Sequence, residues 1–186
     1  MSTTPEQTPP RMTVEEFLQW AEGRDGRFEL IGGDVVAQPA KRARHWEIKL
    51  ATHIALVNAV KMRGGGCHVV PDGATVRVDE QTAYEPDALI YCGPKVDGDA
   101  MIVENPVVVV EVLSPTTGRN DKGRKLADYF RVPSIVHYLI IDAEAPLIIH
   151  HERRLDGAIL THILREGAAR LDPPGIELAL AEIYTA

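Results

Sequence analysis

The sequence is poor in cysteine, in aromatic residues and in positive charge, and it has no long apolar run. Its two cysteines, Cys67 and Cys92, lie far apart without a partner motif, and we interpret them as core residues of a protein in a reducing cytosol. Without a signal peptide or a membrane-spanning stretch, we expect a cytoplasmic protein that makes no membrane contact. The net charge of -7 argues against a broad basic surface that coats nucleic acid. It does not exclude clustered carboxylates that hold a divalent cation, because these add to the negative count.

The chain predicts a short tail and one domain. Residues 1–10 are rich in Thr, Pro and Gln, so we expect a disordered tail there and a single domain over residues 11–186. A capping box from Thr13 to Glu16 predicts a short helix, and Gly32-Gly33 between β-formers predicts a hairpin. The remaining patterns predict helices at about 44–63 and 121–131, and strands at 67–70, 74–78, 88–91, 107–113, 136–141, 147–151 and 159–164. This order favours an α/β (α+β) fold with a mixed central sheet flanked by helices.

The predicted strand over residues 107–113 is apolar except for one carboxylate, Glu111. Such a strand is typical of a sheet that is covered on both faces, where a carboxylate is costly unless it is paired or bound to a cation. A Ser/Pro/Thr/Gly turn and a helix follow. On that helix Asp121, Lys125 and Tyr129 are spaced four residues apart, so they share one face.

A second carboxylate, Asp87, stands at the start of another predicted strand. Pro86 keeps Glu85 extended and constrains the direction of Asp87. Carboxylates on adjacent strands can share a divalent cation whose other ligands are water. The alternative is that Asp87 caps a turn, that Glu111 pairs with a basic residue, and that Asp121 and Lys125 form an ordinary helix pair.

The order of several short motifs resembles the Uma-two family of putative restriction endonucleases, within the PD-(D/E)XK nuclease superfamily. The resemblance runs from Arg11 to Tyr184. It rests on Phe28-Glu29-Leu-Ile31-Gly-Gly33-Asp34, His45, Glu85-Pro86-Asp87, Val109-Val-Glu111-Val-Leu-Ser114-Pro115-Thr116, Asp121, Lys125, Tyr129 and Val132-Pro133. It implies a restriction-endonuclease-like core with the acidic site at one edge of the sheet.

The resemblance also implies roles for individual residues. Asp87 and Glu111 match the two metal-binding acids, and the cation would be Mg²⁺ or Mn²⁺. The superfamily's lysine is expected two positions after Glu111, where this chain has Leu113; the family resembled has an apolar residue there and a lysine on the next helix, which matches Lys125. Asp121 and Tyr129 would position Lys125. Glu29 and His45 match further family positions, as an extra ligand and a proton carrier, or else as hairpin and helix-start contacts.

These features predict a metal-dependent endonuclease that hydrolyses phosphodiester bonds in DNA. Two alternatives stay open: a nuclease for RNA, and a non-catalytic binding module of the same fold in which Glu111 and Lys125 form a buried ion pair. A nucleotide cofactor is not expected, because the glycine-rich segment from Gly118 to Lys125 lacks the P-loop Lys-Ser/Thr pair. By analogy with the superfamily we expect a homodimer. A modest basic cluster could contact phosphates; it comprises Arg119, Lys122 and Arg124.

Overall fold

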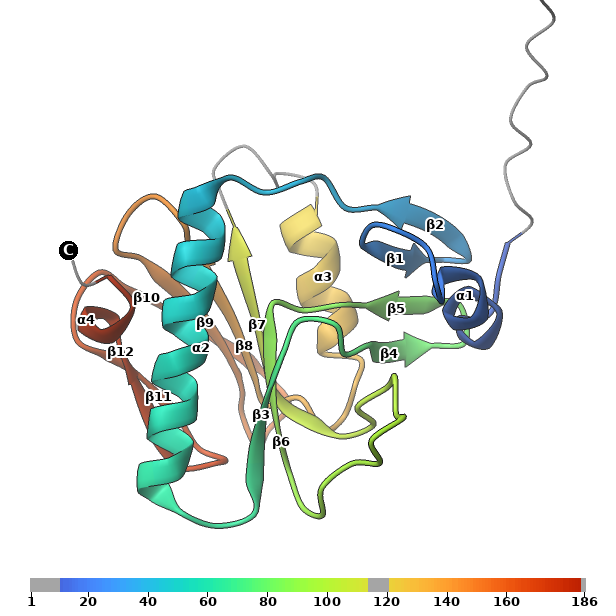
Figure 1. The fold of residues 1–186 in the computed structure, drawn as a ribbon. Coiled ribbons are helices and arrows are strands. Elements are labelled where there is room, and N and C mark those ends of the chain that lie inside the picture. The colour runs from blue at the N-terminus through green and yellow to red at the C-terminus, as the bar shows by residue number, and fades with distance from the viewer. Residues whose placement is uncertain (1–10, 114–120, 185–186) are drawn as a thin grey trace, which may run out of the picture.

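A computed structural model describes residues 11–113 and 121–184 (Figure 1). The predicted tail over residues 1–10 and the Ser/Pro/Thr/Gly turn lie outside the described residues. The helices are α1 (Val14–Ala21), α2 (Ala43–Arg63), α3 (Asp121–Tyr129) and α4 (Leu180–Ile183). The strands are β1 (Phe28–Ile31), β2 (Asp34–Ala37), β3 (Cys67–Pro71), β4 (Val76–Asp79), β5 (Thr82–Tyr84), β6 (Ala88–Cys92), β7 (Pro106–Leu113), β8 (His137–Asp142), β9 (Ile148–Arg153), β10 (Ile159–Leu164), β11 (Ala168–Leu171) and β12 (Ile176–Ala179).

The largest sheet has six strands in the order β10-β9-β8-β7-β6-β3. Strands β7 and β8 are parallel and joined through α3, whereas the other neighbours are antiparallel. This confirms the predicted mixed central sheet flanked by helices. Strand β7 lies inside the sheet, and most of its residues are buried, as its apolar sequence predicts.

Side chains of β7 alternate between two hydrophobic cores. Val108, Val110 and Val112 enter a core on the face covered by α2, α4 and the β11–β12 ribbon. Val109 and Leu113 belong to a second core, which α3 closes on the opposite face. Alternate residues of a strand point to the same face, so the Glu111 side chain is directed to the α3 face together with Val109 and Leu113.

A smaller sheet with the order β2-β1-β5-β4 lies beside α3, with α1 at its outer end (Figure 1). The capping box of Thr13 and Glu16 is present and opens α1, as predicted. The predicted hairpin is formed by β1 and β2, and Gly32 and Gly33 both adopt positive φ in its turn, where a β-carbon would be strained.

The interpretation of the two cysteines is wrong. Cys67 and Cys92 face one another in the register of β3 and β6 and form a disulfide. The sequence could not reveal this, because the pairing depends on the register of two strands separated by a turn and two further strands. Because the two cysteines are paired, they no longer support the expectation of a reducing compartment. Within the described ranges, no helix is long and apolar enough to cross a membrane.

Candidate active site

Glu111 forms the centre of a buried polar cluster between β7 and α3. The Lys125 ammonium donates to Glu111 Oε1 at 2.9 Å, and the Tyr129 hydroxyl donates to the same oxygen at 2.8 Å. Glu111 and Lys125 are 4% and 5% exposed, and Tyr129 is fully buried. Lys125 and Tyr129 reach one carboxylate together because they lie one helical turn apart on α3.

Glu29 joins this cluster from the smaller sheet. Its Oε1 accepts from the Lys125 ammonium at 2.7 Å, and its Oε2 accepts from the Gln38 amide at 2.7 Å. Lys125 therefore bridges two carboxylates that come from different sheets. Glu29, Glu111 and Lys125 line a cavity of about 370 Å³, which is also bordered by Ile31, Val36, Ala37, Gln38, Pro39, Lys41 and Leu113.

Asp87 lies immediately beside Glu111 in the sheet. Its backbone N–H donates to the Val110 carbonyl at 3.0 Å, and its Oδ2 accepts from the Val112 N–H at 2.8 Å. Its two partners, Val110 and Val112, are the residues on either side of Glu111. The two bonds therefore hold Asp87 against β7 at the position of Glu111. Asp87 is 5% exposed.

Three basic side chains lie near the other carboxylate oxygen of Asp87. Oδ1 lies 3.0 Å from the Lys49 ammonium, 3.6 Å from Arg27 Nη1 and 3.8 Å from His45 Nε2. Lys49 also pairs with Asp72 at 2.5 Å. Asp87 is thus held by several groups from α2 and the smaller sheet.

The pKa values of the two neighbouring acids are shifted in opposite directions. Burial alone would raise the pKa of Asp87, but the His45 contact, the Lys49 charge and the Val112 amide together hold that pKa well below its usual range. Burial raises the pKa of Glu111, and the nearby Asp87 charge adds to this, against the opposing effect of Lys125. Burial disfavours charge on Lys125, yet the carboxylates of Glu111 and Glu29 outweigh it and raise the pKa of the ammonium. Lys125 is therefore protonated at neutral pH.

Tyrosines form the wall behind the lysine. The Lys125 ammonium lies 5.1 Å from the centre of the Tyr84 ring, and the rings of Tyr84, Tyr129 and Tyr138 pack in sequence at 5.4 and 5.0 Å. The Tyr84 hydroxyl donates to Asp128 Oδ2 at 2.6 Å. This wall excludes water from one side of the cluster and strengthens its electrostatic interactions.

Most of the predicted site residues converge. Glu29, Lys125, Glu111 and Tyr129 form one hydrogen-bonded group, Asp87 and His45 lie together next to it, and Leu113 lines the cavity beside Lys125. Tyr129 donates to Glu111 Oε1, and its role in positioning Lys125 stays a prediction. The buried ring nitrogens of His45 have no hydrogen-bond partner among the described residues. Arg124 is exposed on α3, while Arg119 and the side chains of Asp121 and Lys122 lie outside the described part.

Sequence reasoning missed Lys49, Arg27 and Gln38. Lys49 follows His45 by four residues on α2, so helical spacing alone could have placed both on one face. Arg27, directly before β1, donates to Glu85 Oε1 at 2.9 Å, and its Nη1 lies 3.6 Å from Asp87 Oδ1. No local pattern marks Arg27 or Gln38, because their partners depend on how the sheets pack.

The donor chemistry of Asp87 and Glu111 fits a hard divalent cation. Mg²⁺ prefers oxygen ligands, commonly binds through one or two carboxylates and retains several waters. Asp87 directly precedes β6, the neighbour of β7, and it stays ionised beside Glu111. Over residues 11–113 and 121–184, no group of three or more His, Cys, Asp or Glu side chains is arranged to hold a metal. A cation here would have Asp87 and Glu111 as its protein ligands and water in its remaining positions.

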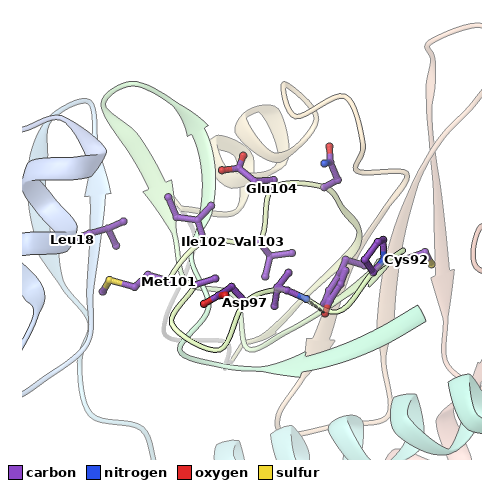
Figure 2. A pocket seen from close by; sticks show the side chains of 12 residues that line it. Leu18, Cys92, Asp97, Met101, Ile102, Val103 and Glu104 are labelled. Atoms are coloured by element: carbon purple, nitrogen blue, oxygen red, sulfur yellow. Dashed lines mark hydrogen bonds between the residues drawn. The ribbon is translucent and has the colours of Figure 1, made fainter. Parts of the chain in front are cut away.

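A larger cavity of about 570 Å³ lies elsewhere, lined mainly by the segment between β6 and β7 (Figure 2). It extends from Leu18 of α1 to Tyr91, and its lining is mainly apolar. Asp97 and Glu104 contribute its only carboxylates, and Lys, Arg and His are absent from the lining residues. This cavity lacks the paired acids and base of the first, so the candidate chemistry belongs to the cavity beside Glu111.

The contact between Lys49 and Asp87 predicts a pH-dependent stability. We expect Lys49→Met to lower the free energy of unfolding at pH 7 by about 2 kcal/mol, the scale of a charged hydrogen bond. Because the folded-state pKa of Asp87 lies well below its ordinary 3.8, the stabilisation is fully present above 3.8 and is lost only as pH falls through the lowered folded-state pKa. Urea unfolding from pH 7 to about 2 should show a difference between the two proteins that is full above pH 3.8 and shrinks in stronger acid. A constant difference would contradict this assignment.

Comparisons with known proteins match nearly the whole chain. Two uncharacterized proteins of Synechocystis sp. are each 26% identical to it; the matches cover 94% and 84% of this chain and 92% and 90% of those proteins. A crystal structure of a putative nuclease belonging to DUF820 from Anabaena variabilis has the same fold, with a TM-score of 0.75 and 14% sequence identity. That match covers 94% of this chain and 98% of the other.

The family model for Uma2, described as "Putative restriction endonuclease", matches residues 14–181. The matched range includes every element from α1 to β12 and all the residues of the buried cluster. This chain belongs to the Uma-two (Uma2) family of putative restriction endonucleases.

Proposed function

We propose that this protein is a metal-dependent endonuclease that hydrolyses phosphodiester bonds in DNA. One observation carries the proposal: Glu111 and Glu29 line one cavity together with a protonated Lys125, and the Asp87 carboxylate is hydrogen-bonded to β7 next to Glu111. Paired acids that can hold a cation, next to a lysine that can stabilise charge on a phosphate, suit phosphodiester hydrolysis. Membership of the family supports the same reaction class.

In this proposal, Asp87 and Glu111 hold Mg²⁺ or Mn²⁺ as protein ligands. When bound, the cation supplies polarisation of the scissile phosphate and a lowered pKa for the attacking water. Tyr129 fixes one oxygen of Glu111 through its 2.8 Å hydrogen bond, which leaves the carboxylate in a defined orientation. The Val112 N–H does the same for Asp87 at 2.8 Å.

Lys125 stabilises negative charge that develops on the phosphate and orients the water. Its ammonium is held by Glu29 and Glu111 in the same cavity, so it is charged before substrate binds. His45, whose imidazole lies 3.8 Å from Asp87, acts as the proton carrier for the leaving oxygen. Arg124 extends from the exposed side of α3 towards solvent, where it can contact the DNA backbone.

A second candidate is a non-catalytic binding module of the same fold. The 2.9 Å contact between Glu111 and Lys125 favours it, because a closed buried ion pair needs no metal to satisfy either charge. An RNA nuclease would use the same residues, and cleavage of matched DNA and RNA strands separates these two substrates.

Binding of Mn²⁺ distinguishes the enzyme from the module without knowledge of the substrate. We expect calorimetry to detect one Mn²⁺ site in the wild type and about a hundredfold weaker binding in Glu111→Gln, because a principal ligand is lost. Glu152→Gln, on β9 away from the cluster, is the matched control and should bind as the wild type does. Absence of Mn²⁺ binding with and without an oligonucleotide would favour the module.

A further inference from the structure

The start of α2 presents three cations and an exposed tryptophan. Lys41, Arg42 and Arg44 fall within four residues, and Trp46 follows with 57% of its surface exposed. We call these four residues the α2 strip. Over the described part of the chain, none of its three cations has a carboxylate partner, whereas Arg27 and Lys49 nearby are both paired.

Fold stability does not account for the composition of the α2 strip. The N-terminus of a helix carries partial positive charge, which disfavours cations there. Yet α2 has no acidic residue in its first turn, and its N-cap residue, Arg42, makes no side-chain capping bond. Trp46 lies outside the hydrophobic cores that α2 helps to form. Residues that cost stability without packing are expected where a surface has a function.

The α2 strip borders the candidate active site. Lys41 lines the same cavity of about 370 Å³ as Glu111 and Lys125. His45 stands between Arg44 and Trp46 in the sequence, is buried, and lies 3.8 Å from Asp87. The Trp46 indole N–H donates to the Lys41 carbonyl at 3.3 Å, so the exposed ring is tethered to the residue at the cavity rim.

We propose that the α2 strip binds a single-stranded segment of nucleic acid and leads it into the site. The three cations contact successive phosphates, and Trp46 stacks on one unpaired base. Free cations beside an exposed aromatic ring are the arrangement that holds single strands, because every unpaired base offers a face for stacking. A base inside a duplex hides both faces against its neighbours. This inference rests on the proposed nuclease function and specifies its substrate class.

Binding of a fluorescein-labelled oligo-dT of about 12 nucleotides tests the proposal. Fluorescence anisotropy without divalent cations prevents cleavage. We expect Trp46→Ala to weaken single-strand binding about tenfold and to leave binding of a duplex of equal length unchanged. Replacing Lys41, Arg42 and Arg44 together by alanine should reduce the salt slope of log K by about 2, at roughly 0.7 for each phosphate contact.

Matched controls lie on the same helix and on a distant loop. Leu50→Ala removes an exposed apolar side chain, 60% exposed, one turn beyond Trp46. Lys61→Ala with Lys95→Ala removes two exposed cations away from the site. Both should bind as the wild type does. In Trp20→Phe, Trp46 is the sole tryptophan, and its fluorescence should be quenched by the oligonucleotide.

The outcomes separate this inference from the nuclease proposal. The role of the strip would be overturned if Trp46→Ala bound single strands as tightly as the wild type does. It would also be overturned if this variant lost as much affinity for the duplex as for the single strand. Mn²⁺ binding that depends on Glu111, together with no single-strand binding by the wild type, would also overturn it while leaving the metal site in place. Strip-dependent binding without any Mn²⁺ site would support the strip and reject the nuclease.

Discussion

Asp87→Asn is expected to reduce metal-dependent DNA cleavage about a thousandfold, which corresponds to roughly 4 kcal/mol of lost transition-state stabilisation. Asparagine keeps the size of the side chain and can still accept the Val112 N–H bond, which is 2.8 Å long in the wild type. It removes the charge that Asp87 retains through its lowered pKa. The loss therefore reports on the carboxylate as a cation ligand.

Cleavage of circular DNA with Mg²⁺ or Mn²⁺ measures this effect. Asp72→Asn is the matched control, because Asp72 also pairs with Lys49 and Arg27 but is partly exposed and has no bond to β7. We expect the control to keep most of the activity. Unfolding by urea should show that Asp87→Asn remains folded. Undiminished cleavage by folded Asp87→Asn would refute the assignment of this acid.

Lys125→Met is expected to destabilise the protein by about 3–5 kcal/mol at pH 7, the cost of removing one partner of a buried ion pair. The substitution leaves Glu29 and Glu111 facing each other without the ammonium that both now contact at 2.7 and 2.9 Å. Adding Glu111→Gln should recover part of the loss, because one uncompensated charge disappears. Lys61→Met, on the exposed end of α2, should change stability by less than about 0.5 kcal/mol.

The Lys125→Met variant should also respond to pH. Burial already raises the pKa of Glu111 above its ordinary 4.5, and loss of Lys125 removes a group that lowers it. A carboxyl with a raised folded-state pKa takes up a proton on folding, so stability rises as pH falls towards 4.5. Urea unfolding should therefore show a smaller defect at pH 5 than at pH 7. A defect that grows in acid would contradict this electrostatic account.

Patterns confined to a few neighbouring residues predicted much of the fold. A continuous apolar run with one carboxylate identified β7 and Glu111, and the spacing on α3 placed Lys125 and Tyr129 on one face. The short elements β5, β11 and β12 were missed because three or four residues carry too little periodicity. Parallel pairing of β7 with β8 follows from the helix between them, and the confirmed mixed sheet reflects that connection.

Contacts between distant elements could not be read from local patterns. The disulfide of Cys67 with Cys92 depends on strand register, and the contact of Glu29 with Lys125 depends on how two sheets pack. The resemblance to the family predicted both Glu29 and Lys125 as site positions. It did not predict that the Lys125 ammonium joins Glu29 to Glu111. Their roles in catalysis stay predictions, which the variants above address.

The bridge from Glu29 through Lys125 to Glu111 also has a consequence during synthesis. The two partners of the first contact are separated by 96 residues, so the chain must have emerged past β7 and as far as Lys125 in α3 before the cluster can close. A nascent chain that stops between Glu111 and Lys125 contains both acids but lacks the ammonium that completes the arrangement. Incomplete translation products should therefore be unable to assemble this site, whatever part of the sheet they form.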